Sequence, residues 1–427
     1  MRYLLAVWDG GGATPPNLGI ARLLVDHGHE VVVYGDPTLA ADIAATGAIH
    51  RTWPTAPQRR STSLDDDVLK DWECRTQIGA GMRLRDRLIS GPAASRFAAD
   101  VVAALDDEPF DAVLADGILF GALVGAEARG IPTVAMIGSV YVAPSRVRPP
   151  AGRLAPARGP RGRARDRAGF VLANLMWDRG GGGLRSLNRV RAEFGLDPLR
   201  HLWEQWERAE RVLLLTGSAF DDPPAEAPNV RYVGPVLEDI PTEGVLELPP
   251  GDDPLVVVGL SSSYMQQSAL LGRIARALST LPVRGVITTG PAIDPAEIDS
   301  APNVAVVRAA AHNELFAKAD LVITHAGHGT LIKAIAAGLP SLCIPLGRDQ
   351  TDNAARAARH GVAMVISQRS DAATIAEAVN RMLHEPSYRA AAEALGEQIR
   401  AEIATGAALT ELEAAAAARH PLGPRRA

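Results

Sequence analysis

The feature that most constrains this sequence is a buried strand that turns sharply into a helix through small residues. Residues 321–324 are apolar or β-branched and predict the strand, and residues 331–338 predict the helix, which ends at a glycine. A helix N-terminus carries free amides and a favourable dipole, so the turn between these elements favours an anion. His325 at the strand end can add a charge-assisted hydrogen bond, worth roughly 1.5–3 kcal/mol. The stretch predicts a diphosphate site, against the alternative of an ordinary strand–helix turn with a surface histidine.

A pair of polar residues follows the next strand along the chain. The apolar run 341–346 predicts that strand, and Asp349 and Gln350 come shortly after it. Their side chains can accept and donate hydrogen bonds, and ligands of parallel sheets bind beyond the carboxyl ends of the strands. The pair therefore predicts contacts to sugar hydroxyls beside the diphosphate.

An ordered series of residues in this half of the chain resembles a known signature. The series is His325-x-Gly327-x-Gly329-Thr330, then Gly338-x-Pro340, Asp349-Gln350 and Asn353. It resembles that of the nucleotide-sugar glycosyltransferases of family 1, which include plant, mammalian and antibiotic-type enzymes. The resemblance covers the last half of the chain well and the first half loosely. It implies the GT-B fold, an α/β architecture in which two Rossmann-like parallel-sheet domains face each other across a cleft.

Length, charge and cysteine content limit the class of protein. The chain has 427 residues, enough for two domains, and its net charge of -5 gives no field that recruits nucleic acid or an anionic membrane. Cys74 and Cys343 lie far apart, so a disulfide framework is not expected and a reducing cytoplasm fits. The apolar run at the N-terminus is too short for a signal peptide, and we expect a cytoplasmic protein with no membrane span. Whether the chain forms a homodimer stays open.

Alternating strand and helix patterns divide the chain into two regions. Residues 1–236 predict an acceptor-binding domain and residues 254–427 a donor-binding domain, joined by a polar linker at 237–253. A Pro- and Arg-rich stretch at about 140–168 predicts a mobile loop, either a solvated excursion or a lid over the acceptor cleft. The family resemblance implies that the last helix packs back on the first domain.

A second glycine-containing turn follows the first strand of the chain. Residues 10–12, with Asp36 at the end of the next strand, form a partial dinucleotide fingerprint. The third glycine is missing, and prolines stand at 15–16, where helix amides should face a pyrophosphate but proline has no N–H. A nicotinamide or flavin cofactor is therefore not expected.

The acidic run 65–67 superficially resembles a metal-binding motif, but it lacks a preceding buried strand and is typical of a solvated helix start. We therefore expect no metal either.

The resemblance also indicates which residues should activate the acceptor. In many relatives a histidine in this first turn is the general base, and an aspartate at the end of a later strand orients it. Ala13 stands in the place of the histidine, whereas Asp116 matches the aspartate. General base catalysis typically contributes ~10²–10⁴-fold. Three explanations stay open: Asp116, ahead of Asp9, acts as the base; the acceptor needs little help; or catalysis has been lost.

The remaining contacts are those that the residues and the resemblance together predict for a nucleotide-sugar donor. The residues expected at the diphosphate are His325, Gly327, Gly329, Thr330 and, from the opposite side, Ser261. Those expected at the nucleobase, mostly through main-chain groups, are Ala310 and His312. Those expected at the sugar are Asp349 and Gln350.

Together these residues predict an inverting glycosyltransferase. It moves a sugar from a TDP- or UDP-sugar to a hydrophobic natural-product acceptor, by O- or C-glycosylation, with Ala13 in place of the usual base. Its partners are then two small molecules, the donor and the acceptor, and no nucleic acid. Two alternatives are a sugar-nucleotide epimerase of GT-B-like architecture and a non-catalytic auxiliary or binding protein, the second suggested by Ala13.

Overall fold

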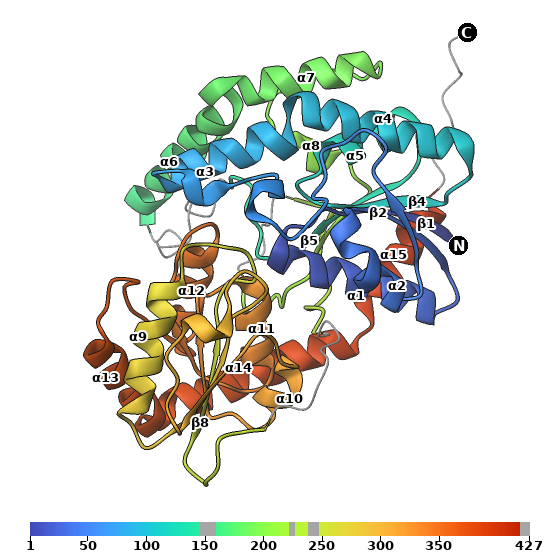
Figure 1. Ribbon diagram of the computed structural model, residues 1–427. Coiled ribbons are helices and arrows are strands. Elements are labelled where there is room, and N and C mark those ends of the chain that lie inside the picture. The colour runs from blue at the N-terminus through green and yellow to red at the C-terminus, as the bar shows by residue number, and fades with distance from the viewer. Residues whose placement is uncertain (146–158, 222–226, 238–246, 419–427) are drawn as a thin grey trace.

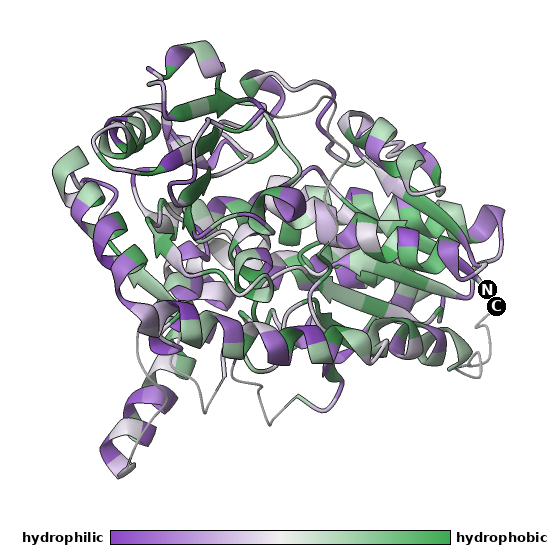
Figure 2. Cartoon of the chain, turned by 90° about the horizontal axis from the view of Figure 1, so that it is seen from below, coloured by the Kyte–Doolittle hydropathy of each residue, from purple (hydrophilic) through white to green (hydrophobic). Residues whose placement is uncertain are grey.

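The computed structural model describes residues 1–145, 159–221, 227–237 and 247–418 (Figure 1). It contains two parallel β-sheets, each covered by helices. The strands are largely buried and rich in Val, Leu and Ile, as is typical of parallel sheets that are covered on both faces. In Figure 2 the strands are mostly coloured as hydrophobic, and the outer helices carry many of the hydrophilic residues. The α/β class predicted from the alternating patterns is confirmed.

The amino-terminal sheet has seven strands in the order β3-β2-β1-β4-β5-β6-β7. Its strands are β1 Arg2–Ala6, β2 Glu30–Gly35, β3 Ile49–Thr52, β4 Ala112–Asp116, β5 Thr133–Ile137, β6 Arg211–Leu214 and β7 Val230–Tyr232. Its helices are α1 Thr14–Asp26, α2 Ala40–Ala45, α3 Gln77–Leu84, α4 Gly91–Asp107, α5 Phe120–Ala128, α6 Gly159–Arg179, α7 Gly183–Glu193 and α8 Glu204–Glu207. Leu4 of β1 pairs with Val32 on one side and Val113 on the other, so the strand order reverses between β1 and β4. Ligands of such sheets bind beyond the carboxyl ends of the strands at this switch point.

Helices α4 and α5 pack closely because glycines of α5 leave room for the α4 backbone. A Cβ on Gly121 would collide with the carbonyl of Ala94.

Within the described residues, one stretch, Ile78–Asp107, is long and apolar enough to cross a membrane by length and composition alone. Half of its apolar window is buried inside the protein, which makes it weak evidence for a span. Shorter helical turns are η1 Gly11–Ala13, η2 Pro37–Leu39, η3 Leu64–Asp66, η4 Asp71–Glu73, η5 Arg85–Ile89, η6 Gly180–Gly182 and η7 Pro295–Glu297.

Helix α6 differs from the predicted loop at about 140–168. It begins at Gly159, so residues 159–168 are helical, while residues 146–158 lie outside the described part of the chain. Pro160 is the second residue of the helix, where its missing N–H breaks no intrahelical bond. The Arg and Ala residues that follow are good helix formers. The loop prediction was therefore wrong for residues 159–168.

The carboxyl-terminal sheet has six strands in the order β10-β9-β8-β11-β12-β13. Its strands are β8 Leu255–Gly259, β9 Arg284–Thr288, β10 Val304–Val307, β11 Leu321–Thr324, β12 Ser341–Cys343 and β13 Ala363–Val365. Its helices are α9 Ser268–Ser279, α10 His312–Phe316, α11 His328–Ala336, α12 Gln350–Arg359 and α13 Ala372–His384. Val257 of β8 pairs with Val286 on one side and Val322 on the other, so this sheet reverses between β8 and β11. The strand predicted at 321–324 is confirmed as β11.

The last two helices link the two sheets (Figure 1). They are α14 Pro386–Ala404 and α15 Ala407–Ala417. Leu412 and Ala415 of α15 belong to the hydrophobic core on one face of the amino-terminal sheet. Arg211 Nε of β6 also donates a hydrogen bond to Glu411 Oε2 at 2.7 Å. Helix α15 therefore lies against the amino-terminal sheet, while the exact limits proposed for the two domains and their linker stay a prediction.

A hydrophobic cluster joins the two halves of the protein. Val140 and Phe220 of the amino-terminal half pack in one buried cluster with Leu331 of α11. Beside it, Arg356 of α12 forms a buried ion pair with Asp221, with an Nε–Oδ1 distance of 2.9 Å. These contacts hold the two switch points opposite each other.

Candidate active site

The turn between β11 and α11 places small residues around a helix N-terminus. Strand β11 ends at Thr324, and α11 begins at His328 with Gly327 as its N-cap. Between them, buried Ala326 has a φ of 64°, a left-handed conformation that is strained for a residue with a Cβ. Strain of this kind clusters at ligand-binding turns, where the surrounding structure holds it in place. The turn is therefore pre-formed, with the helix amides directed out of it.

The two glycines of the turn have different reasons to be glycine. A Cβ on Gly327 would collide with the imidazole of His325, so the protein itself requires glycine there. A Cβ on Gly329 would meet only the carbonyl of Gly12, at an ordinary distance of 3.8 Å. Gly329 is the second residue of α11, in the first turn of the helix. No contact among the described residues explains this glycine, whereas a ligand lying close to the helix backbone would.

His325 is buried at the end of β11. Burial lowers the pKa of its imidazole from 6.5 to about 4, so the ring is neutral at neutral pH. No hydrogen bond of good geometry reaches its buried Nδ1 from the described residues, although the Gly259 backbone interacts with the ring and favours its protonated form. The Nε2 edge of the ring faces the turn, since a Cβ on Gly327 would collide with Nε2. A hydrogen bond from His325 to an anion is therefore made by a neutral imidazole. It is charge-assisted only because the acceptor is negatively charged.

The carboxyl end of β8 faces the same turn. A Cβ on Gly259, the last residue of β8, would lie 3.0 Å from His312 Cε1 and 3.4 Å from Thr330 Cγ2, so both side chains converge here. His312 Nε2 also lies 3.3 Å from Thr288 Oγ1. The imidazole of His312 thus faces the ends of β8 and β9. Contacts of Ala310 and His312 with a nucleobase stay a prediction.

The serine loop after β8 approaches the amino-terminal turn. Ser261 Oγ lies 3.3 Å from Ser263 Oγ. A Cβ on Gly11 would lie 3.2 Å from the hydroxyl oxygens of both Ser262 and Ser263. Since Gly11 follows β1 and the serines follow β8, the switch points of the two sheets face each other. Within the second sheet, β8 and β11 are parallel neighbours, so Ser261 after β8 and the turn after β11 lie at the same edge.

The Asp349–Gln350 pair consists of one cleft residue and one loop support. Gln350 is buried, and its Oε1 accepts hydrogen bonds from the amides of Leu346 (2.7 Å) and Gly347 (2.8 Å). Its side chain therefore already holds the loop in shape. Asp349 is partly exposed, and its Oδ2 accepts a hydrogen bond from Ser139 Oγ at 2.6 Å. Of the two, Asp349 is better situated to bind a sugar hydroxyl, and both sugar contacts stay predictions.

Asp116 ends strand β4 and is buried. Its Oδ2 accepts a hydrogen bond from Asn17 Nδ2 (3.1 Å), and its Oδ1 accepts one from the amide of Ile118 (3.2 Å). Burial raises the pKa of this carboxyl from 3.8 to about 6, although the hydrogen bonds from Ile118 and Asn17 and the nearby Trp8 side chain oppose the rise. The carboxylate is therefore more basic than an exposed aspartate and is still ionised at neutral pH.

Asn17 is the neighbour of Asp116 that sequence reasoning missed. It lies on α1, four residues after the N-cap Ala13, so both residues lie near one face of the helix. Among the described residues, no histidine hydrogen-bonds to Asp116, and the amide of Asn17 does so instead. Asn17 Oδ1 has no partner in the described part of the chain. The only signal in the sequence was the spacing of four residues from Ala13.

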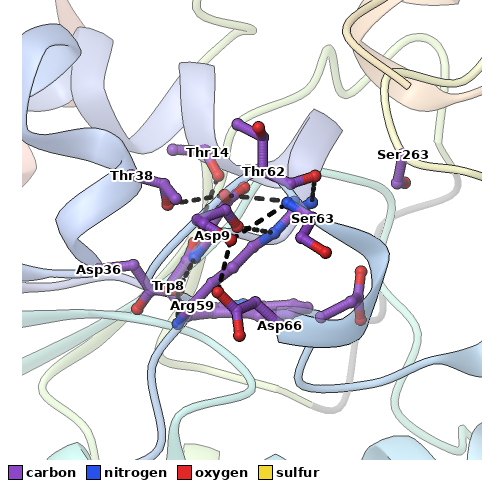
Figure 3. A network of polar contacts seen from close by, with 12 residues as sticks. Trp8, Asp9, Thr14, Asp36, Thr38, Arg59, Thr62, Ser63, Asp66 and Ser263 are labelled. Carbon is purple, nitrogen blue, oxygen red and sulfur yellow. Dashed lines mark hydrogen bonds and ion pairs between the residues drawn. The ribbon is translucent and has the colours of Figure 1, made fainter. Parts of the chain in front are cut away.

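Asp9 lies in a dense polar network beyond β1 (Figure 3). Its Oδ2 accepts hydrogen bonds from Thr38 Oγ1 (2.8 Å) and Arg59 Nη1 (3.4 Å). Asp36 Oδ2 in turn accepts hydrogen bonds from the amides of Asp9 (3.1 Å) and Arg59 (3.0 Å). These contacts tie the loop of Arg59, which the sequence gave no reason to select, to the end of β1. Asp9 is thus paired with a guanidinium, and Asp116 is the better candidate for a base.

Further contacts cross the cleft beside Asp349. Arg348 donates to both carboxylate oxygens of Asp71, with Nε–Oδ2 and Nη2–Oδ1 distances of 2.6 Å and 3.0 Å. Its Nη1 also donates to Ser263 Oγ at 3.1 Å. The rings of Trp72 and Tyr264 pack edge to face, with 5.7 Å between their centroids. Because Asp71 and Trp72 come from the amino-terminal half, this edge of the cleft is closed.

Two facing parallel-sheet domains with a helix-terminal turn in one and a buried carboxylate in the other have the architecture of GT-B glycosyltransferases. Solved structures of that class match nearly the whole chain. The structure of the glycotransferase of kitacinnamycin has a TM-score of 0.75 and 22% identity, and the match covers 97% of this chain and 98% of that chain. The calicheamicin glycosyltransferase has a TM-score of 0.74 and 21% identity, with the same coverage. These similarities confirm the predicted GT-B fold.

Sequence comparison narrows the class. Residues 293–405 match the sequence model of the glycosyltransferase family 28 C-terminal domain. The 4'-demethylrebeccamycin synthase of Lentzea aerocolonigenes is 30% identical over 427 residues, which cover 96% of this chain and 99% of that protein. The oleandomycin glycosyltransferase of Streptomyces antibioticus is 26% identical, and the match covers 97% of this chain and 91% of that protein. The chain therefore belongs to the family 1, GT-B glycosyltransferases that tailor natural products, as its signature residues predicted.

Proposed function

We propose that this glycosyltransferase moves a sugar from a TDP- or UDP-sugar to a hydrophobic natural-product acceptor, with inversion at the anomeric carbon. The observation that carries the proposal is the turn at the start of α11. It combines a helix N-terminus without a side-chain cap, the Nε2 edge of His325 facing Gly327, and Gly329, which no contact among the described residues explains. Among structures with this fold, one glycosyltransferase was crystallised with dTDP and a spinosyn rhamnosyltransferase with thymidine diphosphate, which supports a similar donor here.

The donor diphosphate binds at the N-terminus of α11. The amides of the first turn and the helix dipole stabilise its negative charge, and that charge grows as the diphosphate leaves. His325 donates one neutral N–H to it, and the hydroxyls of Thr330 and Ser261 lie at the same edge of the sheet. Asp349 accepts a hydrogen bond from a sugar hydroxyl.

Asp116 is the general base of the proposed mechanism. Its carboxylate takes the proton from the acceptor nucleophile while that nucleophile attacks the anomeric carbon. The bond between this carbon and the diphosphate oxygen breaks, and the nucleoside diphosphate leaves with the bonding electrons. Attack from the face opposite the leaving group inverts the configuration. The pKa of Asp116, raised by burial to about 6, makes it basic enough to accept a proton yet ionised at neutral pH.

The acceptor is a hydrophobic small molecule, bound on the amino-terminal side of the cleft. The same spinosyn rhamnosyltransferase was crystallised with spinosyn aglycone, which supports an acceptor of natural-product type. We further propose that the enzyme works in the cytoplasm, without a metal or cofactor and without nucleic acid as a partner. Transfer to oxygen or to carbon and assembly as a homodimer are both compatible with the proposal.

The test is incubation with TDP-glucose or UDP-glucose and a panel of phenols and macrolides, with products identified by mass spectrometry and NMR. The expected result is a glycoside with inverted anomeric configuration. Retained configuration would overturn the mechanism, and isomerised donor without transfer would point to an epimerase. Ala13 favours one rival, a non-catalytic auxiliary protein. That rival predicts that calorimetry detects donor binding, that no acceptor is glycosylated, and that changing Asp116 leaves the donor affinity unchanged.

A further inference from the structure

The carboxylate of Asp349 is held from the opposite domain. Ser139 follows strand β5, and its Oγ donates to Asp349 Oδ2 across the cleft at 2.6 Å. Both residues are partly buried. The short distance is typical of a hydroxyl bonded to an ionised carboxylate, one of the stronger classes of hydrogen bond in proteins. A residue of the acceptor-side sheet therefore fixes the residue that faces the donor sugar.

The same oxygen of Asp349 is bonded a second time, from its own domain. Asn353 Nδ2 on α12 donates to Asp349 Oδ2 at 3.0 Å and to the carbonyl of Ala326 at 3.2 Å. Ala326 is the strained residue of the turn before α11. Ser139 and the α11 turn are thus connected through one buried amide and one carboxylate oxygen. Among the described residues, no hydrogen bond reaches Asp349 Oδ1, so this oxygen is left for a ligand.

We propose that Ser139 is a positioning residue for the donor sugar. By holding Oδ2 of Asp349, it turns Oδ1 toward one hydroxyl of the sugar, and it does so only while the two domains are together. The sugar subsite is then complete only in the closed enzyme, because one of its supports comes from the acceptor-side domain. This inference rests on the proposed function, since it requires a nucleotide-sugar donor at Asp349.

Closure itself does not depend on this hydroxyl. Other contacts also join the domains, among them the buried ion pair of Asp221 with Arg356 (2.9 Å) and the hydrogen bond between Thr216 Oγ1 and His328 Nε2 (2.8 Å). Removing the Ser139 hydroxyl should therefore leave the domains together and disturb only the carboxylate. The matched control is Ser95, whose Oγ also donates to a carboxylate at 2.6 Å, that of Glu193, within the amino-terminal half.

The experiment compares Ser139→Ala, Ser139→Thr and Ser95→Ala with the wild type, using TDP-glucose and its single-deoxy analogues. For Ser139→Ala we expect kcat/KM for the donor to fall by about 10–100-fold, as for loss of one charge-assisted hydrogen bond. The loss should nearly vanish for the one deoxy donor that lacks the hydroxyl bound by Asp349. Thr keeps the hydroxyl and should restore most of the activity, and Ser95→Ala should behave as the wild type.

Calorimetry with TDP and TDP-glucose separates this inference from the proposed function. Ser139→Ala should weaken TDP-glucose but leave TDP, which has no sugar, unchanged. Equal weakening of both ligands, or kinetics equal to those of Ser95→Ala, would overturn the role of Ser139. A wild type that binds TDP-glucose but transfers it to no acceptor would overturn the proposed function, while the binding comparison would still decide the role of Ser139.

Discussion

Replacing Asp116 with asparagine should separate the chemistry of this carboxylate from its effect on stability. The two side chains have nearly the same size, and the position is 7% exposed, so packing changes little. As the general base, Asp116 should contribute ~10²–10⁴-fold to the rate, and Asp116→Asn should lose transfer by that factor. In the wild type, kcat/KM should fall as the pH drops through about 6, because protonation removes the base.

The stability effect has a definite sign. The pKa of Asp116 is raised from 3.8 to about 6 on folding, so the folded state binds the proton more tightly than the unfolded state does. Stability is therefore lost as the pH rises from 3.8 to about 6, and the loss is complete above that window. At 1.36 kcal/mol for each pKa unit, the buried charge destabilises the protein at neutral pH by ~3 kcal/mol.

An opposing effect comes from the hydrogen bonds. Both oxygens of Asp116 accept, from Asn17 Nδ2 and from the amide of Ile118. An asparagine has only one oxygen, so one of these donors loses its acceptor, at a cost of about 1–3 kcal/mol. This cost does not change with pH. The difference in the free energy of unfolding between variant and wild type should therefore have a constant part and a pH-dependent part. Only the pH-dependent part measures the raised pKa of the Asp116 carboxyl.

The assay is urea unfolding of both proteins at about pH 3 and about pH 8, below and above the titration window. Relative to the wild type, the free energy of unfolding of Asp116→Asn should be higher by ~3 kcal/mol at the higher pH than at the lower pH. A difference that is equal at both pH values would refute the raised pKa. Transfer that survives within about tenfold would refute the role as base. Asp100→Asn, another buried carboxylate position on α4, should keep its transfer rate and serves as the activity control.

Two further variants test the donor side of the cleft. Gly329→Ala should leave the free energy of unfolding in urea nearly unchanged, because a Cβ there meets only the Gly12 carbonyl at 3.8 Å, yet weaken TDP binding in calorimetry by tenfold or more. Unchanged TDP affinity would remove the diphosphate from this turn. Asp71→Asn removes the bidentate partner of Arg348 and should raise KM for the donor by about tenfold, whereas Glu73→Gln, whose partner lies in its own domain, should not. Equal kinetics of these two variants would show that the contact across the cleft has no part in donor binding.

The part of the site that the sequence predicted is the part made by residues close together in the chain. Strand β11 and helix α11 show their periods locally, and the turn between them carries the signature. Asp349 and Gln350 were also predicted from one local pattern, although burial and two backbone amides make Gln350 a support of its loop. Local sequence could not show that burial would leave His325 neutral, because desolvation depends on everything packed around the ring.

The residues that sequence reasoning missed all act over long distances along the chain. Asn17 reaches Asp116 from 99 residues away, and Ser139 reaches Asp349 from 210 residues away. Neither has a composition or spacing that marks it out, because such contacts arise only when the strand ends of the two sheets meet. Helix α6 was missed for a different reason: its prolines and glycines suggest a loop, but Pro160 falls in the first turn, where a helix tolerates it.

The neighbours of Asp116 also bear on which acceptors this enzyme can use. A histidine between acceptor and aspartate would share the transferred proton with the aspartate as an ion pair. Here Asn17 cannot take up a proton, so Asp116, as the proposed base, would keep it alone. With a base of pKa about 6, removing a proton from a phenol of pKa about 10 is uphill by ~5.5 kcal/mol. For an alcohol near the pKa of water, about 15.7, the step is uphill by ~13 kcal/mol. If half of that difference reaches the transition state, phenols should exceed aliphatic alcohols of similar size by about 10³-fold in kcat/KM. A macrolide hydroxyl that reacts as fast as a matched phenol would mean that another group takes the proton.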